Sequence, residues 1–230
     1  MNVEFHTFSI VGRCPRTGAF GVAVSTARPA VGAAVPWVGP NGAIATQAMT
    51  NTEIGREGLR RLEAGVPIGD ALAALLTEDP MRARRQVHGV GRGGVFVHTG
   101  GECKPWCGHR VGDGFSVAGN LLTGPAVLEA IAAAFSREAD AELGARLLGA
   151  LEAGQAAGGD SRGRQSAALL VTPSVVSKVP PAIFDPRQYE LNIRVDEHAD
   201  PVPELRRIFE LLLAQVAAAR DKSEDALDSE

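Results

Sequence analysis

The order of strand-like and helix-like segments most constrains the fold of this chain. Roughly four strand-like segments come first, and a group of helical segments follows. Strands and then helices come again, before two last strands and a final helix. A parallel α/β sheet would instead alternate strands and helices one by one. The order therefore predicts an α+β fold, a four-layer αββα sandwich in which two antiparallel sheets pack together under helices on both outer faces.

Hydrophobic periodicity and turn residues give the approximate bounds of these segments. The predicted strands cover residues 7–12, 19–25, 31–38, 43–48, parts of 86–98, 115–118, 166–171 and 189–195. The predicted longer helices cover residues 52–65, 67–76, 125–135, 139–154 and 203–220. We expect Thr52 to cap the first helix, and Asp79 and Pro80 to begin a short additional one.

The composition is that of one soluble globular domain. The 230 residues include 45% hydrophobic and 22% charged residues, which is enough for a sizeable core. We place a single domain at residues 1–220 and a charged, disordered tail at residues 221–230. The formal net charge of −4 and the lack of a basic stripe exclude a general nucleic-acid binder.

The sequence carries no signal for secretion or membrane insertion. The first six residues lack the basic segment and apolar core of a signal peptide, and no apolar run approaches the ~20 residues of a membrane span. Three cysteines, Cys14, Cys103 and Cys107, form no disulfide framework and suit a reducing compartment. We therefore expect a cytoplasmic protein without membrane contacts.

The stretch from Ala153 to Val171 is the richest in candidate functional residues. A helical run ends in glycines, polar side chains follow, and the next apolar run is typical of a buried strand. Charged or amide side chains at a strand entrance can present hydrogen bonds to a cleft. Here they are Asp160, Arg162, Arg164 and Gln165. The alternative is a solvated loop fixed by an Asp–Arg pair, which would stabilise the fold little.

Several short motifs, spread from Thr7 to about Leu211, carry a resemblance to a known family. They are Thr7 to Val11, Gly21 to Ser25, Ala43 to Ala48, Thr99 to Cys103 with Trp106, Gly108 and His109, Ala118 to Asn120, Gly158 to Gly163, and Gln165 to Ala167. Together they resemble an uncharacterised bacterial and archaeal family, Domain of Unknown Function 1028.

The resemblance implies the chemistry of the N-terminal-nucleophile (Ntn) hydrolases, with which that family is grouped. In that superfamily the residue that heads the first strand attacks a carbonyl, and its own freed α-amine, with a pKa of ~8, acts as base. Thr7 would be this nucleophile, which requires cleavage after His6. Asp160 and Ser166 would support the amine, and Asn120 or a backbone N–H near Gln47 would stabilise the oxyanion.

The implied activity is hydrolysis of a small amide, lactam or γ-glutamyl-like compound, without cofactor or metal. Arg162 would hold a substrate carboxylate through its planar fork, and the other substrate contacts would come from Ser25, Gln47, His109, Gln165 and Ser166. If Thr7 stays uncleaved, another base is needed, and His6 and His109 are the imidazole candidates. We expect a homodimer or a higher homo-oligomer, with no nucleic-acid partner.

Two other interpretations remain open from the residues. In the first, the chain is an unprocessed, catalytically silent αββα scaffold that binds a small acidic ligand through Arg162, Gln165 and His109. In the second, a structural zinc ion is bound by His98, Cys103, Cys107 and His109, although the Cys-x3-Cys spacing is permissive and no second paired motif supports it. His88 is interpreted as a structural residue.

Overall fold

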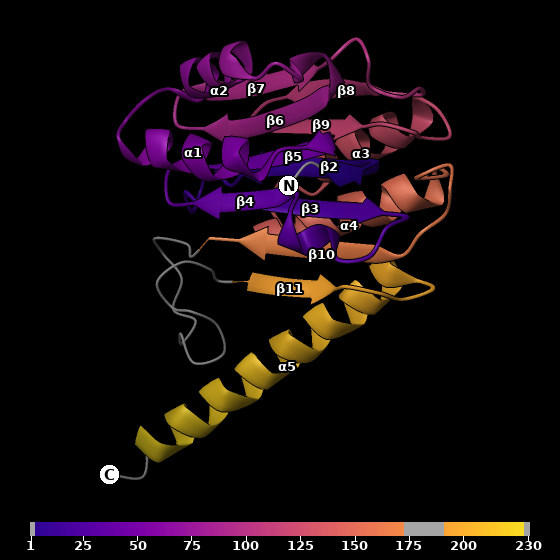
Figure 1. The fold of residues 1–230 in the computed structure, drawn as a ribbon. Coiled ribbons are helices and arrows are strands. Elements are labelled where there is room, and N and C mark those ends of the chain that lie inside the picture. Colours follow the sequence, from indigo (N-terminus) through magenta and orange to yellow (C-terminus); the bar gives the residue numbers. More distant parts are fainter. Residues whose placement is uncertain (1–2, 173–190, 228–230) are drawn as a thin grey trace.

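Two antiparallel sheets form the centre of the molecule (Figure 1). The computed structural model describes residues 3–172 and 191–227. The first sheet has the strand order β1-β5-β6-β7, with β4 also paired to β5, and the second has the order β11-β10-β3-β2-β9-β8. In the first sheet the strands are β1 (Val3–Phe5), β4 (Pro36–Gly39), β5 (Gly42–Thr50), β6 (Arg85–Gly91) and β7 (Gly94–Thr99). In the second they are β2 (Thr7–Arg13), β3 (Phe20–Thr26), β8 (Gly108–Gly112), β9 (Phe115–Gly119), β10 (Ser166–Val171) and β11 (Leu191–Val195).

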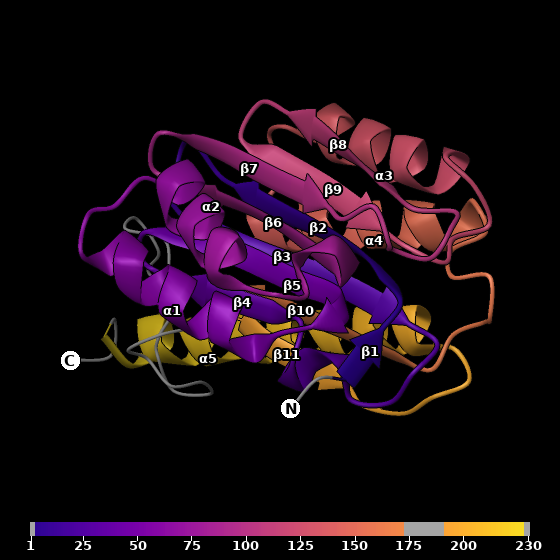
Figure 2. The ribbon, with the colours of Figure 1, turned by 45° about the horizontal axis from the view of Figure 1, so that its top comes forward.

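Helices cover the outer face of each sheet, as Figure 2 shows from a second direction. They are α1 (Thr52–Glu63), α2 (Ile68–Glu78), α3 (Ala126–Arg137), α4 (Leu143–Ala156) and α5 (Pro201–Leu227). An apolar cluster that includes Ile44 and Val87 joins α1 and α2 to the first sheet. A larger cluster joins α3, α4 and α5 to the second sheet. The predicted α+β class with two antiparallel sheets is confirmed.

Strand alternation divides the side chains of β2 between two environments. Phe8 and Ile10 pack in the cluster under α3 and α4, whereas Val11 packs in a third cluster between the two sheets. Successive side chains of a strand point to opposite faces. Thr7 and Ser9 therefore share the face of Val11 and point into the space between the sheets.

The N-terminal segment crosses from one sheet to the other. β1 pairs with β5 in the first sheet, from Val3 opposite Thr50 to Phe5 opposite Ala48. After one residue, His6, the chain enters β2 at the centre of the second sheet. Thr7 therefore lies where the chain passes between the sheets.

Several local predictions differ from the structure. Asn51 caps α1, because its side chain accepts a hydrogen bond from the Glu53 N–H, and Thr52 is the first helical residue. The segment after Asp79 forms only a short 3-10 turn, Arg82–Arg84. Strands β1 and β8 were not predicted, because a three-residue strand and a Gly-flanked strand show little periodicity. α5 begins at Pro201 and continues to Leu227, beyond the bounds of the helix predicted at 203–220. Part of the strand predicted at 189–195 lies outside the described residues.

A buried ion pair holds α2 to β6. The Asp79 carboxylate accepts hydrogen bonds from Arg85 Nε at 2.9 Å and from Asn51 Nδ2 at 3.0 Å. Arg85 and Asp79 are only 2% and 8% exposed. Both charges are thus largely desolvated, and each depends on the other for compensation.

Removal of one partner from this pair is expected to be strongly destabilising. Asp79→Ala should lower the free energy of unfolding by about 3–5 kcal/mol, because it leaves the Arg85 guanidinium buried without its carboxylate. Urea denaturation measures the change. The matched control is Glu53→Ala, which breaks the exposed Glu53–Arg56 pair and should cost less than about 1 kcal/mol. Equal losses in the two variants would contradict the assignment.

Candidate active site

The peptide bond between His6 and Thr7 carries two strong donors on its carbonyl oxygen. The His6 oxygen accepts a hydrogen bond from the Thr26 hydroxyl at 2.5 Å and from Arg162 Nη2 at 2.8 Å. Thr26 is brought there by the β2–β3 hairpin, in which it lies directly opposite Thr7. A hydroxyl and a guanidinium on one carbonyl are the arrangement that stabilises negative charge on that oxygen.

The Thr7 hydroxyl adjoins this carbonyl and has no hydrogen-bond partner among the described residues. Its Oγ1 is fully buried and unpaired. A buried unpaired hydroxyl costs about 1–3 kcal/mol, so its presence calls for an explanation. The His6 and His109 rings, the base candidates for an uncleaved Thr7, bond to other groups: His6 to Asn120 and Glu4, and His109 to Thr99.

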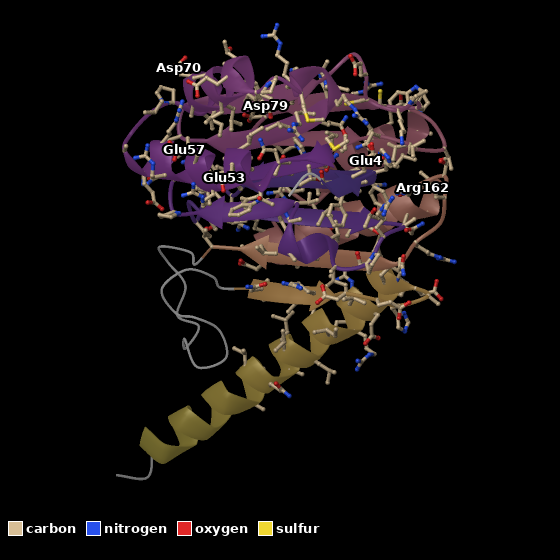
Figure 3. The ribbon with its side chains drawn as sticks, viewed as in Figure 1. Glu4, Glu53, Glu57, Asp70, Asp79 and Arg162 are labelled. Atoms are coloured by element: carbon tan, nitrogen blue, oxygen red, sulfur yellow. The ribbon has the colours of Figure 1, made fainter. Side chains whose placement is uncertain are left out.

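The loop before β10 positions Arg162 through Asp160. The Asp160 carboxylate accepts hydrogen bonds from Arg162 Nε at 3.0 Å, Arg162 Nη2 at 2.6 Å, and the backbone N–H of Ala27 at 3.2 Å. The Asp160 side chain is 1% exposed. Asp160 thus holds the guanidinium group of Arg162 in place. The Nη2 atom that bonds to Asp160 also donates to the His6 carbonyl. Arg162 and Glu4 are labelled on the same side of the molecule in Figure 3.

Glycines allow this loop its sharp path. Gly158 has a φ of 118°, and an added Cβ there would lie 2.3 Å from Thr123 Oγ1. Beyond it, Asp160 forms an isolated antiparallel bridge with Leu122. The loop is therefore fixed against the segment that follows β9, which also carries Asn120. This explains why a connection between a helix and a strand contains so many polar residues and glycines.

A network of buried amides lies beside the His6–Thr7 bond. Asn120 accepts from His6 Nδ1 at 2.7 Å through Oδ1, and its backbone N–H donates to the Thr7 carbonyl at 3.0 Å. Its Nδ2 donates to Gln86 Oε1 at 2.9 Å, and Gln47 Nε2 donates to the same oxygen at 2.8 Å. Asn120 and Gln47, two predicted site residues, are thus joined through Gln86.

Two backbone carbonyls fix the direction of every bond in this network. Gln86 Nε2 donates to the carbonyls of Gly108 and Gly119, so Gln86 Oε1 must be the acceptor for Asn120 and Gln47. Amide orientation is inferred from such partners. Asn120 Oδ1 then faces His6 Nδ1, which must carry a proton. Burial lowers the pKa of His6, whereas the hydrogen bond to Asn120 and the Glu4 carboxylate beside Nε2 oppose this shift.

The same reasoning assigns the tautomer of His88. The Ser9 hydroxyl donates to Gln47 Oε1 at 2.6 Å, so it must accept from His88 Nε2 at 2.8 Å. His88 Nδ1 is then the acceptor for the Ser116 hydroxyl at 2.9 Å. The neutral imidazole satisfies both contacts, and burial lowers the pKa of His88 to about 3.

His88 should therefore make the fold less stable as the pH falls. An unfolded histidine titrates near pH ~6.5, so above that value neither state binds the extra proton and stability is full. Between about pH 6.5 and pH 3 only the unfolded chain gains the proton. From roughly pH 6.5 to 4.5, urea unfolding should show a loss of stability that is about 2–3 kcal/mol larger in the parent chain than in His88→Gln. The surface variant His98→Gln should keep the loss, and an equal loss in His88→Gln would refute the explanation.

Some predicted site residues lie elsewhere. Ser25 pairs with Phe8 and Ala167, which pack under the helices, so Ser25 points away from Thr7. Ser166 shares a row with Thr7 and Thr26, but its hydroxyl donates to the Arg28 carbonyl at 2.5 Å. The backbone N–H of Gln165 donates a hydrogen bond to the Thr26 carbonyl, and the Gln165 carbonyl accepts one from the His198 N–H. His109 joins the cluster only indirectly, because its partner Thr99 accepts from Gln86 at 3.0 Å.

A family model describes most of this chain. It matches residues 7–205, and its description is "Family of unknown function (DUF1028)". The chain belongs to the DUF1028 family. The DUF1028 match begins at Thr7, the residue that follows His6, whose carbonyl oxygen accepts the two hydrogen bonds from Thr26 and Arg162. β1 and His6 lie outside the matched region.

A crystal structure of another DUF1028 protein has a similar fold. It is protein SPO2555 from Silicibacter pomeroyi, which is 30% identical to this chain. The match covers 89% of this chain and 88% of that one, with a TM-score of 0.76. No curated protein gives a significant match. The DUF1028 description names no activity, and a shared fold does not by itself determine one.

The zinc interpretation of this DUF1028 chain finds no matching geometry. Within residues 3–172 and 191–227, no group of three or more His, Cys, Asp or Glu side chains is placed to hold a metal ion. Cys103 Sγ donates to the Arg85 carbonyl, and His98 Nε2 bonds to the Arg82 carbonyl. In the same part of the chain, no helix is long and apolar enough to cross a membrane.

Thr26, Gln86 and Ser9 are residues of this candidate site that the sequence analysis did not select. Thr26 could have been found by counting the register of the first hairpin outward from its turn at Cys14 to Gly18, which places Thr26 opposite Thr7. Gln86 and His88 alternate on one strand, a weaker signal for a shared face. Ser9 lies two residues after Thr7 and therefore on the same face.

Proposed function

We propose that the chain is an N-terminal-nucleophile amidohydrolase that exposes Thr7 by cleaving its own His6–Thr7 bond. One observation carries the proposal: the His6 carbonyl is held by Thr26 and Arg162 while the adjoining Thr7 hydroxyl is buried and unpaired. The first feature prepares the carbonyl for attack, and the second leaves the attacking oxygen free. Together they account for an otherwise costly buried hydroxyl.

The cleavage would proceed by an acyl shift and hydrolysis. Thr7 Oγ1 attacks the His6 carbonyl carbon, and negative charge develops on the oxygen that Thr26 and Arg162 hold. The bond from that carbon to the Thr7 nitrogen breaks, and the nitrogen takes the hydroxyl proton. A water molecule then attacks the resulting ester, the Thr7 oxygen leaves with a proton, and His6 ends in a carboxylic acid. The products are residues 1–6 and a chain that begins with Thr7.

The same groups would then act on substrate. The freed α-amine of Thr7, with a pKa near ~8, can take the proton of its own hydroxyl. A substrate carbonyl in the place of the His6 carbonyl would meet the same two donors. Asp160 orients Arg162, so Arg162 acts as an oxyanion donor rather than as a ligand for a substrate carboxylate. A small amide, lactam or γ-glutamyl-like compound is the proposed substrate.

The family match supports this assignment through its first residue. It starts at Thr7, which would be the first residue of the mature chain. The two facing sheets with outer helices are also consistent with an N-terminal-nucleophile hydrolase. The alternative, a silent scaffold that binds an acidic ligand, has less support, because the fork of Arg162 bonds to Asp160 and to the His6 carbonyl.

Intact-mass measurement over time tests the proposal. Freshly purified full-length chain should lose residues 1–6, and N-terminal sequencing should then begin at Thr7. Release of p-nitroaniline from γ-glutamyl-p-nitroanilide should rise in parallel with the cleaved fraction. A mass that stays at full length throughout, together with no amide turnover, would remove the proposed function.

A further inference from the structure

The Glu4 side chain lies in a cationic site beside the proposed reaction centre. Its carboxylate accepts hydrogen bonds from Arg84 Nη2 at 2.9 Å and Lys104 Nζ at 3.1 Å, and it lies 3.3 Å from His6 Nε2. Arg84 ends the short turn before β6, whereas Lys104 lies in the connection between β7 and β8. Two segments distant in sequence thus supply cations to one carboxylate. The hydrogen bond from Lys104 lowers the pKa of Glu4.

The backbone of β1 occupies a strand-binding position. Its residues pair with Ala48, Met49 and Thr50 on the edge of β5 that β4 leaves uncovered. The Phe5 side chain points the other way from Glu4 and packs in the apolar cluster between the sheets, where it is 7% exposed. Backbone pairing with alternate side-chain pockets is how proteins bind extended peptides.

This strand leads directly to the carbonyl that would react. Glu4 lies two residues before His6, whose carbonyl accepts from Thr26 and Arg162. Cleavage would break the covalent link and allow β1 to dissociate. Its departure would leave a strand edge, an apolar site and two cations, all aligned with the reactive Thr7.

We propose that the position occupied by β1 on the edge of β5 is the acyl-side substrate site and that Arg84 and Lys104 select an extended acidic peptide. The carboxylate of that peptide lies two residues before the residue whose carbonyl is attacked. This proposal rests on the proposed function. Before cleavage, residues 4–6 of the chain itself occupy the site. The substrate that binds after cleavage would resemble them, with an acidic side chain in the place of Glu4. The proposal specifies the amide that is hydrolysed as one at the end of a short acidic peptide segment.

Two chromogenic peptides that differ in one side chain test whether the site prefers an acidic substrate. The self-cleaved protein is assayed with N-acetyl-Glu-Phe-His-p-nitroanilide and with the Gln-Phe-His analogue, which differs only in the charge of one side chain. We expect kcat/KM to be at least about tenfold higher for the Glu probe, because only a carboxylate pairs with both cations. The peptide N-acetyl-Glu-Phe-His should also inhibit more strongly than its Gln counterpart.

Variants identify the cations responsible. Arg84→Ala combined with Lys104→Ala should make the two probes equivalent, mainly by slowing the Glu probe. Both side chains are well exposed, at 41% and 51%, so the variant is expected to fold. The control is Arg110→Ala, which removes an exposed arginine paired to Glu129 and should keep the preference.

The outcomes separate this proposal from the proposed function. Self-cleavage with equal turnover of the two probes would overturn the acidic-peptide site and leave the amidohydrolase intact. A preference that survives the double variant would likewise overturn the role of Arg84 and Lys104. A chain that neither loses residues 1–6 nor turns over any probe would overturn both.

Discussion

Thr7→Val is expected to keep residues 1–6 attached and to lower amide hydrolysis by about 10⁴-fold or more. Valine has the shape of threonine but lacks the hydroxyl, so neither the acyl shift nor attack on substrate can occur. The Thr7 hydroxyl is buried without a partner, and its removal should leave the free energy of unfolding unchanged or slightly higher. Intact mass, p-nitroanilide turnover and urea unfolding measure the three effects.

Two variants sharpen this test. Thr7→Ser retains a hydroxyl and should restore part of the cleavage, which a purely structural role for Thr7 would not explain. Ser25→Ala is the matched control, because it also removes a buried unpaired hydroxyl, but on the opposite face of the sheet. Normal cleavage in Thr7→Val, or loss of cleavage in Ser25→Ala, would disprove the assignment of the nucleophile.

The donors on the His6 carbonyl should control the rate of cleavage. Thr26→Val and Arg162→Gln each remove one hydrogen bond to the oxygen that develops charge, and each should slow the loss of residues 1–6 by about 10²–10³-fold. The time course of intact mass gives the rate constants. The losses should not add fully in the double variant, because the two donors act on one oxygen.

The chain offers a close control for Arg162. Arg164 lies two residues further along the same loop and pairs with Asp200 at the surface, at 2.9 Å. Arg164→Gln should cleave at the normal rate. Because Arg162→Gln also removes the main ionic partner of the buried Asp160, thermal unfolding should accompany the kinetics. If the stable, isosteric Thr26→Val cleaves normally, the carbonyl donors are not part of the reaction.

The sequence predicts the layer order and the polar loop before β10 more firmly than the contacts within the candidate site. Runs such as Ser166–Val171 have the apolar composition of a buried strand, so β10 has the predicted bounds. Asp160 and Arg162 could be selected because glycines and charges together are unusual for a turn. Their partner, the His6 carbonyl, belongs to the backbone, and no side-chain pattern reveals it.

Register explains most of the remaining differences. Ser25 and Thr26 are adjacent in sequence, and only the pairing with β2 shows which of them faces Thr7. A shift of one residue moves every side chain to the other face. The contacts of Gln86 and His88 depend in addition on how the two sheets are placed against each other. That placement results from tertiary packing and has no local signature.

The attachment of β1 makes it an intramolecular ligand of the β5 edge. A tethered segment experiences an effective concentration of ~1 mM or more, so while the His6–Thr7 bond is intact it outcompetes a free peptide of equal affinity at lower concentrations. Once that bond is cut, retention of residues 1–6 would depend on their own affinity and on dilution. Concentrated preparations would then remain inhibited by their own N-terminal peptide, and activity per molecule would rise on dialysis without further cleavage.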